Sequence, residues 1–267
     1  RLTALSPGRD VLGLERITTL LARLADPQLD LPPVFHVAGT NGKGSTCAFL
    51  RAAIEASGLS CHVYTSPHLV RFNERIRIAG RLIEDDRLAD YLARVLDIAE
   101  GTGASFFEVT TAAAFLAFAE TPADACVIEV GLGGRLDATN VLPRPAVCGI
   151  AALGIDHEAF LLAPEPGTPD LPMERIAFEK SGIAKADVPL VIQRYATGMM
   201  GAIAGQAMRA GAFVKVRGED WDSALYQGRL HYRDVDGRLN LPVPRLPGEH
   251  QADNAALAVA MIRHQSA

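Results

Sequence analysis

His36-Val-Ala-Gly-Thr-Asn-Gly-Lys-Gly-Ser-Thr46 is the stretch that decides the fold. It begins inside Val34–Ala38, an apolar run of strand length, and it ends inside Ser45–Ser57, where apolar residues recur at helical spacing. Gly58 follows and is a typical helix stop. A buried strand, a glycine-rich turn, a lysine and hydroxyls at a helix start together predict a loop that binds phosphate.

The chemistry of this loop is that of a nucleotide site. Glycines let backbone N–H groups approach phosphate oxygens, and the helix N-terminus adds positive potential. Lys43 is placed to reach the outer phosphates, and Ser45 or Thr46 to contact a magnesium ion. The match to the phosphate-loop pattern is imperfect, because Val37 occupies the first glycine position and Gly44 follows the lysine. The alternative is an ordinary tight turn. The residues expected to bind the nucleotide are Gly39, Thr40, Asn41, Gly42, Lys43, Gly44, Ser45 and Thr46.

Strand-like and helix-like segments alternate along the chain, which predicts an α/β fold with a mostly parallel sheet flanked by helices. The Asp236-Gly237 pair within Leu225–Leu241 predicts a small β-hairpin region near the C-terminal end. The arginine-rich stretch after Thr65 is expected to be a loop. The expected strands are Val34–Ala38, Cys61–Thr65, Asp124–Val130, Ala146–Leu153, Val188–Gln193 and Phe213–Val216. The expected helices are Ser45–Ser57, Leu88–Glu100, Phe107–Ala119, 173–180, Thr197–Ala210 and Ala252–Arg263.

Composition excludes some classes of function. The chain has 267 residues, of which 49% are hydrophobic, so a sizeable core can form. A net charge of −5 offers no general basic surface for nucleic acid, and no apolar run is long enough for a membrane span or a leader peptide. The four cysteines form no C-x-x-C pair and fit a reducing compartment. We therefore expect a cytoplasmic protein without nucleic-acid or membrane partners.

Polar side chains stand near the ends of three predicted strands. Ser66 follows the second strand, Glu129 lies near the end of the third, and His157 follows the fourth. Ligands gather at the carboxyl ends of parallel strands, and a hydroxyl, a carboxylate and an imidazole suit magnesium held on phosphates. Each residue alone also fits a surface or structural role. Lys180, near the end of a predicted helix, alone fits a solvated lysine.

Seven motifs, in this order, resemble those of the bifunctional dihydrofolate synthase/folylpolyglutamate synthase family of the Mur ligase superfamily. The resemblance covers residues 14–264 and implies the P-loop NTPase-like central domain of a Mur ligase. The motifs are Val37-Ala-Gly-Thr-Asn-Gly-Lys-Gly-Ser45, Tyr64-Thr-Ser-Pro-His68, Arg71-Phe-Asn-Glu-Arg75, Glu129-Val-Gly-Leu-Gly-Gly-Arg-Leu-Asp-Ala-Thr-Asn140, Asp156-His157, Glu179-Lys-Ser-Gly-Ile183 and His250-Gln-Ala-Asp-Asn254.

The resemblance implies a role for each matching residue. Lys43, His157 and Lys180 would serve catalysis, with Lys180 carried as a carbamate, and Asn254 would lie near the nucleotide base. Two magnesium ions, and a monovalent cation, would accompany ATP. The implied metal ligands are Ser45, Ser66, Glu129, His157 and Lys180. The implied substrate contacts are Ser66, Pro67, His68, Arg71, Phe72, Asn73, Arg75, Asp137 and Asn140, although Arg71 and Arg75 also fit solvated loop charges.

The implied reaction joins L-glutamate to dihydropteroate, or to the glutamate tail of reduced folates, through an acyl phosphate made from ATP. The family expectation is a monomer. Residues 1–267 would form the ATP-binding domain, and the family's C-terminal glutamate-binding domain would be absent from this chain. The segment 158–172 is longer and richer in proline than the family pattern. The alternatives are another Mur-type amino-acid ligase, or an ATP-binding fragment that is inactive without the second domain.

Overall fold

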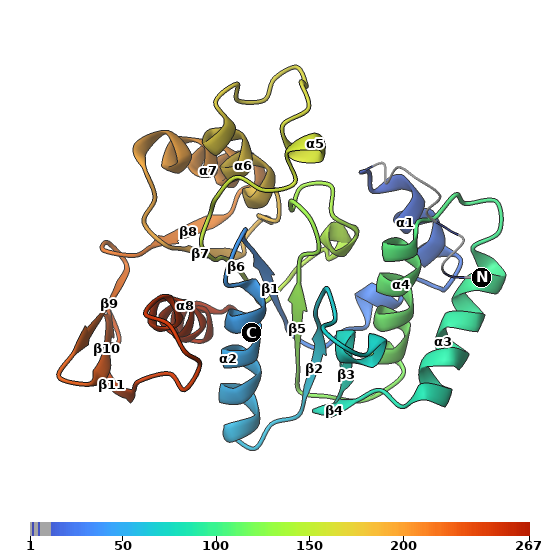
Figure 1. Cartoon of the computed structure of the whole chain (residues 1–267), viewed down its shortest axis with the longest axis horizontal. Helices are drawn as coiled ribbons and strands as arrows, with labels where there is room; N and C mark the ends of the chain where they lie inside the picture. The colour runs from blue at the N-terminus through green and yellow to red at the C-terminus, as the bar shows by residue number, and fades with distance from the viewer. Residues whose placement is uncertain (1, 3–4, 6–11) are drawn as a thin grey trace.

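The structure is a computed structural model and describes residues 2, 5 and 12–267. An eight-stranded sheet with the strand order β4-β3-β2-β5-β1-β6-β7-β8 forms the centre of the molecule (Figure 1). Strands β2, β5, β1, β6, β7 and β8 run parallel, while β3 and β4 join one edge antiparallel. The strands are β1 (Val34–Ala38), β2 (Cys61–Tyr64), β3 (Ile76–Ile78), β4 (Arg81–Leu82), β5 (Ala125–Glu129), β6 (Val147–Ile150), β7 (Pro189–Ile192) and β8 (Phe213–Val216).

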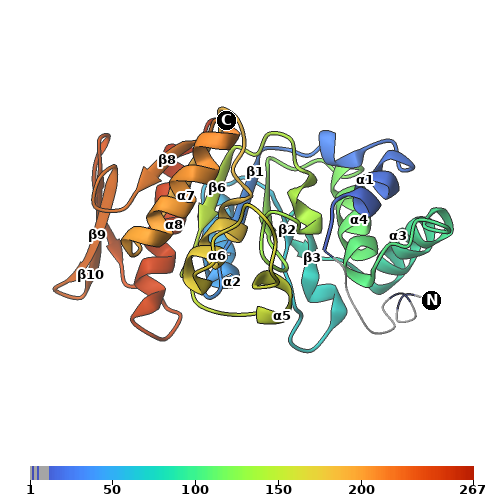
Figure 2. The same cartoon turned by 90° about the horizontal axis from the view of Figure 1, so that it is seen from above.

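Helices cover both faces of the sheet, which explains why its central strands are apolar at nearly every position. On one face, Val37 and Val127 pack against α2 and α8. On the other face, Ile128 packs with the α1, α3 and α4 group, and Ile150 packs with α6 and α7. Figure 2 shows these last two groups toward opposite ends of the sheet. The helices are α1 (Glu15–Ala22), α2 (Lys43–Ala56), α3 (Asp85–Ile98), α4 (Phe106–Ala119), α5 (Glu158–Leu161), α6 (Pro172–Ser181), α7 (Thr197–Ala210) and α8 (His250–His264).

The predicted fold class is confirmed: a mostly parallel sheet is flanked by helices. The bounds of β1, α7 and β8 are as predicted, and the other expected elements are present with shifted ends. Helix α2 begins at Lys43, two residues before the predicted start, because Gly42 already acts as its N-cap. The arginine-rich stretch is only partly a loop: Ile76–Ile78 forms strand β3, since Ile76 and Ile78 alternate with a polar residue and face the core.

The predicted hairpin is part of a larger unit, a three-stranded antiparallel sheet that Figure 1 shows beside α8. The turn at Asp236-Gly237 joins β10 (Arg229–Asp234) to β11 (Gly237–Pro242) as expected. The third strand is β9 (Trp221–Tyr226), most of which lies before the predicted hairpin region Leu225–Leu241. Trp221 stacks on Tyr232 with ring centroids 6.1 Å apart, and both are buried in the core that includes α8.

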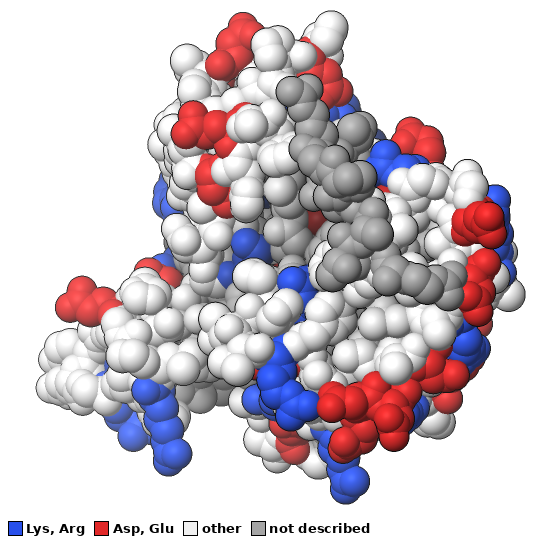
Figure 3. Space-filling view, turned by 45° about the vertical axis from the view of Figure 1, so that its right-hand side comes forward, with Lys and Arg blue, Asp and Glu red and all other residues white. Residues whose placement is uncertain are grey.

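On the face shown in Figure 3, acidic side chains gather along one edge, and basic side chains lie among neutral ones. Helix α3 begins with Asp85 and Asp86 and carries Asp90 one turn later. This face therefore carries both signs of charge. None of the helices in the described part of the chain is both long and apolar enough to cross a bilayer.

Candidate nucleotide and substrate site

The loop after β1 is hydrogen-bonded to the segment that follows the neighbouring strand β6. The backbone N–H groups of Thr40 and Asn41 donate to the Ala152 carbonyl, and the Thr40 hydroxyl donates to the Gly154 carbonyl at 2.7 Å. These bonds fix the loop at the carboxyl ends of β1 and β6, where parallel sheets bind ligands.

Gly42 could not be replaced by any other residue without a change in the loop. Its φ of +83° lies in the left-handed region, and an added Cβ would lie 2.2 Å from the Asn254 side-chain oxygen. Asn254 therefore packs directly on the loop, from α8 and more than two hundred positions later in the chain. Its amide nitrogen donates to Gln251 at 3.1 Å, which orients the side chain.

A cavity of about 810 Å³, here called the first cavity, opens beside this loop. It brings together four of the predicted residues: Asn41, Gly42, Ser45 and Asn254. Most of its other walls lie outside the motifs found in the sequence. Arg217 is one of them, and its guanidinium donates to Asp253 on α8 at 2.6 Å and to Gln193 at 3.1 Å. The walls that were not predicted are Ala152, Leu153, Gln193, Arg194, Tyr195, Arg217, His250 and Asp253.

The two hydroxyls at the start of α2 differ in their surroundings. Ser45 borders the first cavity, whereas Thr46 is fully buried and its hydroxyl has no hydrogen-bond partner. The structure therefore favours Ser45 over Thr46 as the contact for an ion. Lys43 Nζ donates to the carbonyls of Gly39 and Thr40 at 2.9 and 3.2 Å. Its ammonium thus lies folded over the glycine loop.

Glu129 ends β5 beside this loop, and its carboxylate is buried. The Ser66 backbone N–H donates to it at 3.3 Å, and a Cβ added to Gly44 would lie 3.8 Å from both carboxylate oxygens. Burial raises the pKa of Glu129 to about 7, against the opposing effect of the Lys43 ammonium. A buried carboxylate that faces a phosphate loop offers hard oxygen ligands, which fit magnesium on bound phosphates.

Lys180 is not a solvated lysine, because it is only 1% exposed near the end of α6. Its Nζ lies 3.6 Å from Asp156 Oδ1, which is longer than a direct hydrogen bond. Burial lowers the pKa of Lys180 to about 8; the Asp156 carboxylate opposes this shift, and the Lys43 ammonium adds to it. The predicted site lysines of two separate motifs therefore act on one another electrostatically.

The motif that starts at Glu129 and the motif that contains Lys180 interlock through glycine. A Cβ on Gly134 would lie 2.7 Å from the carbonyl oxygens of both Glu179 and Lys180. The Arg135 backbone N–H donates to the same Glu179 carbonyl at 2.8 Å. A glycine here lets the loop after β5 lie directly on the end of α6.

We predict that Gly134→Ala destabilises the protein by about 1–3 kcal/mol, because the added methyl group must displace backbone atoms. Gly201→Ala is the matched control, since Gly201 lies in α7 and an added Cβ meets nothing within 4 Å. The control should be neutral, or more stable by up to about 1 kcal/mol. Urea unfolding curves measure both. Equal stabilities of the two variants would contradict the interlock.

A second cavity, of about 420 Å³, is lined by residues of the loops after β2, β5 and β6 and by residues at the starts of α1 and α4. It brings together five predicted residues: Ser66, Pro67, Arg75, Asp137 and His157. His157 is the N-cap residue just before α5, has a left-handed conformation and is exposed. Sequence reasoning missed the remaining walls, several of them apolar. They are Leu12, Gly13, Arg16, Ser105, Phe107, Glu108, Gly131, Leu132, Leu136, Ala138 and Phe160.

The two arginines of the loop after β2 have different environments. Arg75 is 8% exposed, lies over the rings of Phe72 and Phe106 at 5.4 and 5.6 Å, and donates to His68 at 2.9 Å. Arg71 pairs instead with Asp85 at 3.0 Å, and its side chain is 66% exposed. Arg75 is thus built into the cavity wall, whereas Arg71 is a solvated loop charge.

The side chains of three other predicted substrate-binding residues make hydrogen bonds within the protein. The Asn73 amide donates to the Ile83 carbonyl and to Asp85, both at 2.8 Å. The Asn140 amide donates to the carbonyls of Arg135 and Gly182, both at 3.0 Å, and Asn140 does not border the second cavity. Asp137 does border the cavity, but it also accepts from the backbone of Leu132 and Thr139. Asn73 and Asn140 therefore position loops.

Metal ligands in this region are few. No group of three or more His, Cys, Asp or Glu side chains that could hold a metal ion occurs among the described residues. Of the predicted ligands, Ser66 and Glu129 are in contact, Ser66 and His157 share the second cavity, and Ser45 borders the first. The remaining oxygen ligands would have to come from the phosphates and from water.

Fold and site together define a nucleotide-binding α/β domain with a phosphate loop and an adjoining partly apolar cavity. No family model matches the chain. The chain is 36% identical over 253 residues to the dihydrofolate synthase/folylpolyglutamate synthase of Escherichia coli, covering 94% of this chain and 56% of that protein. It is 35% identical to the human mitochondrial folylpolyglutamate synthase, covering 93% of this chain and 40% of the relative.

Solved structures agree with these relatives. The E. coli enzyme FolC in complex with DHPP and ADP superposes with a TM-score of 0.88 at 34% identity, covering 98% of this chain and 60% of that one. A bifunctional folylpolyglutamate synthase/dihydrofolate synthase with Mn, AMPPNP and L-glutamate bound gives 0.83 at 35% identity, covering 98% and 61%. Over nearly its whole length the chain is therefore similar to the dihydrofolate synthase/folylpolyglutamate synthases. It spans about half the length of the curated relatives it matches.

Proposed function

We propose that this chain supplies the ATP-binding part of a ligase that joins L-glutamate to dihydropteroate, to reduced folates, or to both. The observation that carries the proposal is that Glu129 connects the two cavities. Its carboxylate faces Gly44 of the phosphate loop, which borders the first cavity, and it accepts from Ser66, which lines the second cavity together with Phe107 and Arg75. A nucleotide and a planar aromatic acid bound in these cavities would meet at the loop. Related structures that hold ADP or AMPPNP support the same assignment.

The proposed reaction has two steps. A carboxylate oxygen of the acceptor attacks the γ-phosphorus of ATP, the bond to the β–γ bridging oxygen breaks, and ADP leaves. The amine of L-glutamate then attacks the acyl carbon, loses a proton, and inorganic phosphate departs with the former carboxylate oxygen. No side-chain nucleophile is needed, so catalysis depends on positioning and on charge.

The residues of this chain would have separate roles in binding the nucleotide and the metal ions. Lys43 and the backbone N–H groups of the loop would hold the transferred phosphoryl group, and Asn254 would lie near the base. Magnesium on the phosphates would supply neutralising charge when bound. Carbamylated Lys180 remains part of the proposal, as does a monovalent cation. The residues that would hold the two ions are Ser45, Ser66, Glu129, His157 and Lys180.

The location and oligomeric state of the enzyme belong to the same proposal. We propose a cytoplasmic monomer whose partners are its small-molecule substrates. The four cysteines are free and buried, which is consistent with a reducing compartment.

The test is to incubate the chain with MgATP and L-glutamate, to offer dihydropteroate and tetrahydrofolate separately, and to measure product masses. A glutamylated product supports the ligase and identifies the acceptor. ATP binding without any product would support the alternative of an ATP-binding fragment. Failure to bind ATP would contradict the proposal.

We predict that Arg75→Ala weakens binding of the folate acceptor by about tenfold, the scale of one lost charge-assisted contact. MgATP binding should not change, because Arg75 borders only the second cavity. Arg71→Ala is the control from the same loop and should change acceptor binding less than about twofold, since exposed ion pairs contribute little. Titration calorimetry measures both ligands. Equal effects of the two substitutions would show that Arg75 has no special role.

A further inference from the structure

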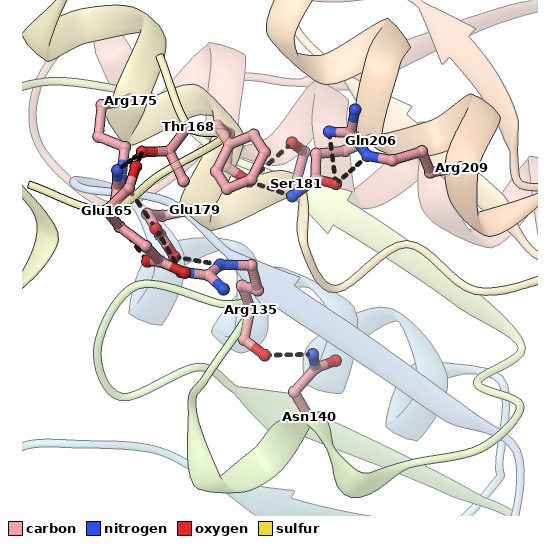
Figure 4. A network of polar contacts seen from close by, with 10 residues as sticks. Arg135, Asn140, Glu165, Thr168, Arg175, Glu179, Ser181, Gln206 and Arg209 are labelled. Carbon is pink, nitrogen blue, oxygen red and sulfur yellow. Dashed lines mark hydrogen bonds and ion pairs between the residues drawn. The ribbon is translucent and has the colours of Figure 1, made fainter. Parts of the chain in front are cut away.

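The proline-rich segment 162–171 is held to the site by a compact ion-pair network (Figure 4). Glu165 carries the network because its carboxylate accepts from Arg135, on the loop after β5, at 2.5 Å and from Arg175, on α6, at 3.1 Å. Both arginines also donate to the buried Glu179, each at 3.0 Å. Thr168 accepts from Arg175 as well, and its hydroxyl donates to the Glu165 carbonyl at 2.6 Å.

The segment has little else to hold it in place. A groove of about 460 Å³ lies between its residues and Arg175, so its proline side chains do not fill a core there. Residues 163–167 are exposed. The described contacts that fix this segment to the body of the protein are therefore mainly those of Glu165 and Thr168.

This segment follows directly on α5, which forms part of the second cavity. The Leu162 backbone N–H donates to the Glu158 carbonyl at 3.0 Å, so the segment continues out of the α5 turn. Leu161 is buried against Gly133, while Phe160 is 39% exposed and borders the second cavity. Leu161 thus anchors this turn, while Phe160 faces the second cavity.

We propose that Glu165 is a positioning residue that holds α5 in place, so that Phe160 packs on the planar heteroaromatic ring of the acceptor and helps to select it. This inference rests on the proposed function, because it assumes that the acceptor occupies the second cavity. Arg135 connects the segment 162–171 to the site. Its backbone N–H donates to the Glu179 carbonyl, and its guanidinium donates to the Glu165 carboxylate. Without the Glu165 charge, Glu179 is the one carboxylate of this network left to pair with Arg135 and Arg175.

The test compares Glu165→Gln, Phe160→Ala and the double variant by titration with dihydropteroate and tetrahydrofolate, and separately with MgATP. Each single variant should bind the acceptor about three- to tenfold more weakly, the scale of one aromatic contact, with MgATP affinity unchanged. In the Phe160→Ala background, Glu165→Gln should change acceptor affinity less than about twofold, because both substitutions remove the same contact.

Glu120→Gln is the matched control. Glu120 is 40% exposed, against 43% for Glu165, and it also pairs with an arginine at 2.5 Å, but on α3. If Glu165→Gln behaves like this control, the inference is wrong. If the two losses add, Glu165 does not act through Phe160, and the inference is equally wrong. Phe160→Ala removes only a partly exposed ring, so it tests the aromatic contact even if Glu165→Gln folds poorly. If the unmodified chain binds MgATP but neither acceptor, the proposed function fails instead.

Discussion

The Lys43→Ala variant should ligate glutamate about 10²- to 10³-fold more slowly than the unmodified protein, the usual loss when one preorganised donor to a developing anion is removed. Lys43 is the cation of the phosphate loop, and its Nζ already lies on the carbonyls of Gly39 and Thr40. A short movement from this position would bring it to a bound phosphoryl group. The reduction should appear mainly in kcat, because the charge that Lys43 stabilises develops during transfer.

The fold should survive this change, because the two hydrogen bonds that Lys43 makes are local to the loop. Lys215→Ala is the control, since Lys215 forms a partly exposed ion pair with Asp220 at 3.2 Å on β8. Its rate should match that of the unmodified protein. Steady-state rates and thermal melts of both variants decide the question. A Lys43→Ala rate within about threefold of normal would exclude Lys43 from phosphoryl transfer.

The parts of the fold that the sequence predicted best are those with a strong local pattern. Strand β1 is buried at every position because helices cover both of its faces, and a glycine-rich loop follows it directly. Strand β4 has two residues, both exposed, and has no such pattern. Strand β9 depends on a pair between Trp221 and Tyr232 that lie eleven positions apart, so its start could not be inferred from its own residues.

The site shows the same division between local and distant causes. Glycines and a lysine close together in sequence predicted the phosphate loop. Arg71 and Arg75 could not be told apart, because the burial of Arg75 depends on Phe106, which belongs to a different helix. Thr46 was expected to bind the nucleotide alongside Ser45, but the helix turns its hydroxyl into the core. Gln193 and Arg217 directly follow β7 and β8, and only the topology of the sheet brings these strand ends to the loop.

The Lys180→Ala variant should lose activity by about 10²-fold or more, and short carboxylic acids such as formate or acetate should restore part of it. The basis is the position of the side chain: a lysine that is 1% exposed, held 3.6 Å from Asp156 and within the electrostatic reach of Lys43. A second cation beside Lys43 would be unfavourable in the free site, whereas a carbamate would present oxygens to a metal ion. An added carboxylate would occupy the space left by the truncated side chain and supply similar oxygens.

Lys185→Ala provides the control, because Lys185 is partly buried but donates to the Asn140 carbonyl at 3.0 Å, away from both cavities. Carboxylic acids should not raise the activity of this variant or of the unmodified protein. Activity is measured as glutamylated product at saturating MgATP. Full activity of unrescued Lys180→Ala would exclude any role for the side chain. A loss that no carboxylic acid restores would contradict the carbamate and leave the unmodified amine as the functional group, since only a carbamate is replaceable by a free carboxylate.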